Sequence, residues 1–407
     1  MAAWLIMAGT SFGDIAEPAG ATGYVSAFGY GTAVGTETWM DCLARGSYIW
    51  ANLYVRVISN GVLAASTLRS RKNAVNGNQS VSIPASTTGV FRDTTNTDSL
   101  ASGDLFNFQV VTGAGGTDLL CNIVTSTLKT VGDSNIPILC TVGDRTLASA
   151  IVFLSLGGSA LATATEARTQ YIVRVAATLS SLRFRISENT RDGASTGRTR
   201  INGVNGAQSV SIPASTAGNF EDIVNTDAVA VGNSVNYQLV PGGASGTITA
   251  RVIQVKSTSV GRQVIASYVD VGTVAFGTTA YYPAEGLGQD PTATEANVQG
   301  LAQVNFATKN LFVRSPTNSV NGASTIRTRR NTGNGNLSVS IPASTTGTFE
   351  DTTRGDEFYP GDLINYQIVT GGAAGSIVIT QIGFELAQLA APTLRQQARV
   401  AVGAGVI

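Results

Sequence analysis

The 407-residue sequence contains no histidine, and it has only three cysteines and three methionines. Without histidine, the chain cannot build a Ser-His-Asp or Cys-His nucleophile, use imidazole as a general base, or bind a metal through imidazole. Cys42, Cys121 and Cys140 are odd in number and unrelated in spacing. We therefore expect small buried side chains there rather than a disulfide framework.

The sequence is also poor in charge, with 13% charged residues and 26 basic against 26 acidic side chains. Such a balance gives no electrostatic footprint for nucleic acid or for an anionic membrane. No apolar run approaches the length of a transmembrane helix. The first residues, MAAWLIMAGTSFGD, lack the basic segment of a secretory signal. We expect a protein that is made in the cytoplasm and stays there until it assembles.

What the sequence does contain is a threefold internal repeat. The seven residues SVSIPAS occur at 80–86, 209–215 and 338–344, always 129 positions apart, and a Thr-Glu pair keeps the same step at 36–37, 165–166 and 294–295. A unit of this size can bury its own core, unlike the short repeats of a solenoid. The repeat predicts three units: 1–140 with a short N-terminal arm, 141–269, and 270–407 with a short C-terminal tail.

Alternation of apolar and polar residues predicts the secondary structure of each unit. In LFNFQVV, Phe106, Phe108 and Val110 alternate with Asn107 and Gln109, and SVNYQLV and LINYQIV repeat the pattern. Period two with one apolar face indicates a half-buried antiparallel strand. SVSI alternates in the same way, and the proline after it ends the strand. In unit two we further expect strands at residues 151–156, 170–175, 197–202, 247–255 and 263–269.

About eight strands per unit, bounded by Gly, Asn and Ser, predict the fold class. We expect an all-β chain of three tandem jelly-roll-like antiparallel β-sandwiches. No Pro-rich or Gly/Ser linker separates the units, and the step never drifts across the matched stretch. These features favour three sandwiches packed around a pseudo-threefold axis over a string of beads.

The stretches GRTRINGVNGAQSVSIPASTAGNFED and VGNSVNYQLV resemble a repeat type common in bacteriophage virion proteins, with jelly rolls similar to the C1q and tumour-necrosis-factor type. The resemblance implies a non-enzymatic virion structural protein, most simply a capsid decoration or cement protein acting as a single-chain pseudo-trimer. A tail or fibre component, or a surface adhesin that binds glycans, is the alternative. The implied partners are the major capsid protein or other virion proteins, with no nucleic acid, membrane or cofactor, and the implied location is the virion.

Two features are candidates for contact with such a partner. One is the apolar start of the chain, Trp4, Leu5, Ile6 and Met7, which could dock into a neighbouring subunit or simply form the first strand of unit one. The other is a pair of arginines on one strand face in every unit, which could line a contact or cover a solvated sheet face with their stems. These arginines are Arg69, Arg71, Arg198, Arg200, Arg327 and Arg329.

Carboxylates are the remaining route to chemistry. Glu37 recurs in each unit as Glu166 and Glu295, and a glycosidase would need two such groups in one cleft. A carboxylate present in every unit is more typical of a turn cap or an ion pair, so we expect no catalytic site. Asp93, Asp98 and Asp104 could supply oxygens to calcium, but Asp also favours turns. We expect no metal site.

Overall fold

The structure, a computed structural model, describes residues 4–10, 15–28, 33–131, 135–156, 162–259, 263–284 and 291–388. These residues are strand almost throughout, as their alternating pattern predicts. The helical segments among them are single 3-10 turns that each follow the threonine of a Thr-Glu pair: η1 (Glu37–Trp39), η2 (Glu166–Arg168) and η3 (Glu295–Val298). The expectation of an all-β chain with little helix is confirmed.

Unit 1 is a sandwich of two antiparallel sheets. The first contains β1 (Trp4–Thr10), β10 (Gly116–Thr130), β5 (Tyr48–Val62) and β8 (Gly89–Leu100) in that order, with β2 (Ile15–Glu17) beside β10. The second contains β3 (Thr22–Ser26), β9 (Leu105–Val111), β6 (Ser66–Lys72) and β7 (Val75–Ile83), with β4 (Cys42–Leu43) beside β9. Counted along the chain, the eight principal strands run 1-8-3-6 and 2-7-4-5, which is jelly-roll connectivity.

Units 2 and 3 repeat this connectivity. In unit 2 the first sheet is β11 (Asn135–Leu147), β20 (Ile248–Ser259), β15 (Ala177–Asn189) and β18 (Gly218–Val229), and the second is β13 (Ala162–Thr163), β12 (Val152–Leu154), β19 (Ser234–Gly242), β16 (Gly193–Ile201) and β17 (Val204–Ile212), with β14 (Tyr171–Ile172) beside β19. In unit 3 the first is β21 (Gln263–Ala275), β30 (Ser376–Gln388), β24 (Phe306–Ser315) and β28 (Gly347–Phe358), with β25 (Thr317–Asn318) beside β30. The second is β22 (Thr279–Pro283), β29 (Leu363–Val369), β26 (Ser324–Arg330) and β27 (Gly333–Ile341), with β23 (Gly300–Leu301) beside β29.

The expected unit boundaries require a correction. Strand β11 crosses the boundary expected at residue 140, and its pairing partners lie in β20 of unit 2. Strand β21, expected as the last strand of unit 2, pairs with β30 of unit 3. Units 2 and 3 therefore begin several residues earlier than expected, because the first strand of each is identified by its long-range partner and not by its local pattern.

Each unit encloses its own hydrophobic core between its two sheets. Equivalent positions fill these cores in all three units, and each of the following side chains is at most 5% exposed: Val81, Val210, Val339, Phe108, Tyr237 and Tyr366. Full burial of such a side chain contributes about 1.5–3 kcal/mol. The units thus have separate cores, in agreement with the size of the repeat.

The expected polar face of β9 is not solvated. Phe106, Phe108 and Val110 point into the core as predicted, but Asn107 and Gln109 are also buried, at 1% and 8% exposure. The segment that contains η1 and β4 covers this face, and Asn107 donates to the Oδ1 of Asp41 across 2.7 Å. The alternation identified the strand correctly, whereas the cover over its second face comes from residues far away in the sequence.

The repeated SVSIPAS segment has a structural explanation. In unit 1, Val81 and Ile83 enter the core, Pro84 ends the strand, and Ser86 adopts a left-handed backbone conformation with φ 53°. The N–H of Ser86 then donates to the carbonyl of Val62 at 3.0 Å. The same serine has φ 52° and 51° in the other two units, so the turn after this strand is the same in all three copies.

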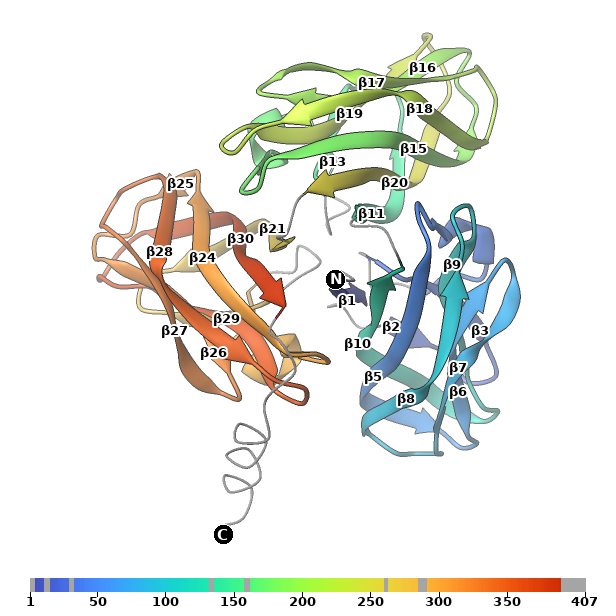
Figure 1. Ribbon diagram of the computed structural model, residues 1–407, viewed down its shortest axis with the longest axis horizontal. Coiled ribbons are helices and arrows are strands. Elements are labelled where there is room, and N and C mark those ends of the chain that lie inside the picture. Colours follow the sequence, from blue (N-terminus) through green and yellow to red (C-terminus); the bar gives the residue numbers. More distant parts are fainter. Residues whose placement is uncertain are drawn as a thin grey trace.

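The three sandwiches surround a common centre (Figure 1). The first strands of the units, β1, β11 and β21, lie on the sides that face this centre. The arrangement is the expected pseudo-threefold cluster and not a string of beads. It creates three places where one unit meets the next, which we call junctions 1–2, 2–3 and 3–1 after the units they join.

Candidate functional site: the junctions between units

The Thr-Glu pairs build one side of every junction. In unit 1 the carboxylate of Glu37 accepts two hydrogen bonds from Arg71, from Nε at 2.8 Å and from Nη2 at 2.9 Å. Arg200 donates in the same way to Glu166 in unit 2, and Arg329 to Glu295 in unit 3. A bidentate pair of this kind fixes both position and orientation. It ties each 3-10 turn to the sheet of its own unit.

The turn held in this way, or the chain just after it in unit 2, presents a carbonyl group to an arginine of the adjacent unit. The Nε of Arg185 donates to the carbonyl of Thr38 at 3.2 Å across junction 1–2. The Nη1 of Arg314 donates to the carbonyl of Gln170 at 3.0 Å across junction 2–3, and Arg56 donates to Ala296 across junction 3–1. Arg56, Arg185 and Arg314 occupy one repeat position. The three contacts therefore run head to tail and close the ring.

The short strands β4, β14 and β23 form the next contact at each junction. The backbone of Leu43 exchanges two hydrogen bonds with the side chain of Gln254, at 3.3 and 2.7 Å. The N–H of Ile172 donates to the Oε1 of Gln381 at 3.3 Å. At junction 3–1 an apolar contact replaces the amide, because Leu301 packs against Tyr54 and Ile123. The three junctions share their geometry but not their chemistry.

An arginine–glutamate pair reinforces two of the junctions. Arg45 donates to Glu221 at 2.9 Å across junction 1–2. Arg174 donates to both carboxylate oxygens of Glu350, at 2.6 and 2.5 Å, across junction 2–3. Because the two pairs lie at the same repeat positions, they stabilise the same relative placement of neighbouring units.

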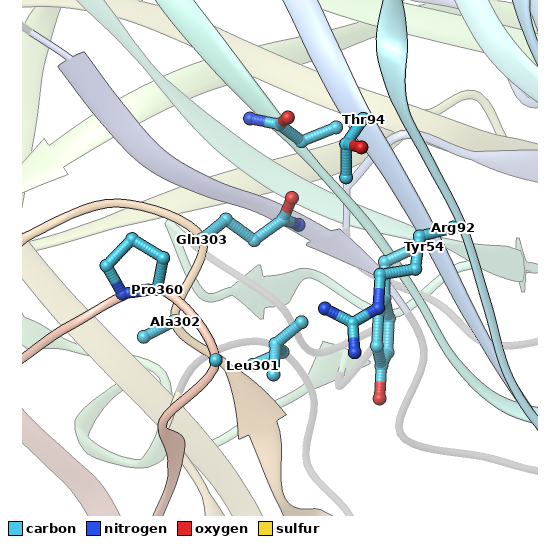
Figure 2. Close-up of a pocket in the computed structure, with 9 residues that line it drawn as sticks. Tyr54, Arg92, Thr94, Leu301, Ala302, Gln303 and Pro360 are labelled. Atoms are coloured by element: carbon cyan, nitrogen blue, oxygen red, sulfur yellow. The ribbon is translucent and has the colours of Figure 1, made fainter. Parts of the chain in front are cut away.

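Junction 3–1 lacks this pair. The arginine position holds Gln303, and the glutamate position holds Arg92. A cavity of about 140 Å³ opens between them. Figure 2 shows Arg92 and Tyr54 on one wall, with Leu301, Gln303 and Pro360 facing them from unit 3.

One further position distinguishes the junctions. Arg183 is buried at junction 1–2, where it donates to the Asp41 carbonyl at 3.3 Å, to Gln254 at 3.1 Å and to Asn219 at 2.8 Å. Burial lowers the pKa of Arg183 to about 10, so the guanidinium remains charged at neutral pH. Phe312 holds the equivalent position at junction 2–3 and lies under the Arg174 guanidinium at 5.2 Å.

The sequence-predicted contact residues lie elsewhere or have other partners. Arg71, Arg200 and Arg329 bind glutamates of their own units, as described above. Arg69, Arg198 and Arg327 each have a buried Nε without a hydrogen-bond partner in the described part of the chain. The backbone of Trp4–Thr10 forms β1 and pairs with β10, which is the first-strand alternative, and its side chains lie outside the described residues. Contact of any of these residues with a partner stays a prediction.

The aspartates of unit 1 that could have supplied oxygens to calcium, Asp93, Asp98 and Asp104, hold turns and loops instead. Burial opposes ionisation of Asp93, but hydrogen bonds from Asn96 and Ser80 outweigh it and lower the pKa of Asp93 to about 2. Asp98 accepts from neighbouring backbone and side-chain donors, and Asp104 from the backbone of Ala101. Within the described residues, no three Asp, Glu or Cys side chains are grouped so as to hold a metal ion.

The cysteines also have a structural environment. Burial raises the pKa of Cys42 to about 11 and that of Cys121 to about 12. Both thiols are therefore protonated near neutral pH, which makes them poor nucleophiles. Cys140 has its side chain outside the described residues. Over the described ranges, no helix is long and apolar enough to cross a membrane.

Sequence reasoning missed the junctions. The repeat position of Arg56, Arg185 and Arg314 was not among the contact candidates named from the sequence. A usable signal was present, because two repeat positions hold Arg-Arg-Gln (45, 174 and 303) and Arg-Glu-Glu (92, 221 and 350). Arginine at the first position accompanies glutamate at the second position of the next unit, and both residues are replaced together at 303 and 92. Such paired replacement indicates a contact, provided that the units are known to meet.

Comparison with known proteins gives no family. No family description matches the sequence, and no curated protein matches it significantly. The atomic structure of Sulfolobus Turreted Icosahedral Virus matches with 13% identity over 86% of this chain and 82% of its own, at a TM-score of 0.17. A structure described as the triple jelly roll fold and turret assembly in an archaeal virus matches with 14% identity over 92% and 91%, at a TM-score of 0.16. At such TM-scores neither match carries an argument about this chain.

Proposed function

We propose that the chain is a non-enzymatic virion structural protein that attaches to a protein shell as a single-chain pseudo-trimer. Its most specific form is a capsid decoration protein seated at sites of local threefold symmetry. The observation that carries the proposal is the closed ring, in which three jelly rolls of the same connectivity meet head to tail around a common centre. The sequence resemblance to phage virion repeats supports the same role.

The ring geometry suits such a site. A partner site with threefold symmetry offers three equal contacts, and a ring of three equal units can satisfy all of them at once. Joining the units in one chain removes the entropy cost of assembling a trimer, which is estimated at about 4–15 kcal/mol for each association step. The joined chain also permits differences between units, such as those at junction 3–1.

Two measurements test the proposal. Small-angle scattering of the purified chain should give a radius of gyration of roughly 22–30 Å, since a single globule of this length is expected near the lower value. Dimensions of an extended rod would contradict the pseudo-trimer. Electron cryomicroscopy of particles that contain the chain should then locate it over local threefold positions of the shell. Density only at a tail tip would refute decoration and favour the tail or fibre alternative.

The N-terminal arm provides a sharper variant. If residues 1–8 dock into a shell subunit, their deletion should leave a folded chain that no longer binds particles. If they act only as the first strand of unit 1, deletion should instead destabilise that unit, because β10 loses most of its pairing with β1. Calorimetry of the truncated chain, combined with particle binding, separates the two outcomes.

A further inference from the structure

Junction 3–1 has the features of a binding site. At the other two junctions, side chains of this chain occupy the equivalent place. At junctions 1–2 and 2–3 a glutamate carboxylate lies against an arginine of the adjacent unit. At junction 3–1 the guanidinium of Arg92 stands on the opposite side, and no acidic residue lines the cavity. A glutamate neutralises the arginine at junctions 1–2 and 2–3, whereas Arg92 has no acidic partner among the residues that line the cavity at junction 3–1.

The donors at this place have no partners among the described residues. Arg92 is exposed and makes no ion pair or hydrogen bond with the described residues. The Nε2 of Gln303 is buried and has no hydrogen-bond acceptor in the described part of the structure. A buried donor without an acceptor is costly, so such a group usually meets a water or a ligand. In Figure 2 the Gln303 side chain reaches from its own wall toward the wall that carries Thr94 and Arg92.

We propose that junction 3–1 binds a carboxylate group of side-chain size between Arg92 and Gln303. The guanidinium supplies the charge and a planar set of donors that matches a carboxylate, and the amide N–H supplies a further hydrogen bond. The cavity of about 140 Å³ is close to the ~150 Å³ that holds a six-atom ring. It has room for the carboxyl end of a glutamate but not for a large ligand.

The lining favours a carboxylate over a phosphate. One guanidinium and one amide can satisfy a single negative charge, whereas a phosphate carries nearly two charges and needs more donors. Leu301, Ala302 and Pro360 give the unit 3 wall an apolar surface, which suits the methylene groups next to a carboxylate. The ligand is either a free small acid or an acidic side chain of a protein that the ring binds.

The test uses N-acetyl-glutamate N-methylamide as the probe, with the glutamine analogue as its neutral control. Arginine Nε–Hε signals of the ¹⁵N-labelled full-length chain are followed by NMR at low salt. The glutamate probe should shift the Arg92 signal saturably, and the glutamine analogue should not. Arg92→Gln should weaken binding by at least about tenfold, because charge-assisted hydrogen bonds are lost. Arg354→Gln, which removes an exposed arginine that does not line the cavity, should leave binding unchanged.

A double substitution distinguishes this site from general attraction to positive charge. Arg92→Glu with Gln303→Arg restores the arginine–glutamate pair of the other junctions and lowers the net charge by one, the same change as in Arg92→Gln. It should abolish probe binding while raising the thermal stability of the chain. Equal binding of both probes, or undiminished binding by Arg92→Gln or by the double variant, would overturn the inference.

The same double variant identifies the source of the carboxylate. If an acidic side chain of a shell protein fills the site, the variant should occupy particles less than the wild type does. If the site takes a free acid, particle occupancy should be unchanged while probe binding is lost. Because the NMR titration needs no particle, it can fail or succeed independently of the proposed virion role.

Discussion

Reversing the charges at junction 2–3 tests the ring arrangement most directly. Arg174 and Glu350 form a bidentate pair in which the arginine side chain is 12% exposed and the glutamate side chain 32%. The set of variants is Arg174→Glu, Glu350→Arg and the two combined. Each single variant places like charges against one another, and the combined variant restores attraction with the direction reversed.

The magnitude follows from the geometry. Two unit charges about 4 Å apart attract by about 4 kcal/mol at an effective dielectric constant near 20. Desolvation of the mostly buried arginine offsets part of this, and fully exposed pairs retain only about 0.2–1 kcal/mol. We therefore expect a coupling free energy of about 1–3 kcal/mol between the two positions. Recovery in the double variant should be incomplete, because Phe312 loses the guanidinium stacked over its ring.

Native-state hydrogen exchange measures this coupling where it acts. Strands β14 and β24 lie at the junction, so their opening free energies should fall in each single variant and recover in the double variant. The tryptophans all lie in unit 1, so their fluorescence would not report on this junction. Arg354→Gln serves as a control on the same strand, since that arginine is 56% exposed and pairs at 3.5 Å with Asp351 of its own unit and not across the junction. A coupling energy indistinguishable from zero would refute the pairing of units 2 and 3 described above.

Four further substitutions test the interior of the units. Phe108→Ala should lower the free energy of unfolding of unit 1 by about 3–5 kcal/mol. Asn107→Ala should lower it by about 1–3 kcal/mol, because the buried Asp41 carboxyl loses its donor. Equal losses would show that the two faces of β9 are misassigned. Asp93→Asn should flatten the acid limb of unit 1 stability: the pKa of Asp93 is about 2 when folded and near 3.9 when unfolded, so its contribution is present above about pH 4 and is lost as the pH falls toward 2. A wild-type slope in this variant, measured by denaturation at each pH, would contradict the hydrogen-bond assignment. Arg191→Met should destabilise unit 2 by about 3–5 kcal/mol, since the buried guanidinium donates to four backbone carbonyl groups; unchanged calorimetric stability would mean that water replaces it.

Local pattern was sufficient for most of the expected strands and for the number of units, but the strand expected at residues 170–175 is only the two-residue β14. Period-two alternation in LFNFQVV predicts β9 because successive side chains of a strand point to opposite faces, which is a property of the backbone alone. The step of 129 residues predicts three units because each copy is large enough to bury a core. The end of the SVSI strand at Pro84 was also readable, since proline cannot donate to a sheet ladder.

Only the tertiary structure decided which strands pair and what covers them. Strand β11 belongs to unit 2 because its hydrogen bonds go to β20, more than a hundred residues later. Asn107 is buried because η1 and β4 fold over it, which no pattern within β9 encodes. The junctions depend on contacts between residues as far apart as Arg45 and Glu221. The sequence shows Arg92 where the other units have glutamate and Gln303 where they have arginine. Only the structure shows that these two positions face each other, because the third unit packs against the first.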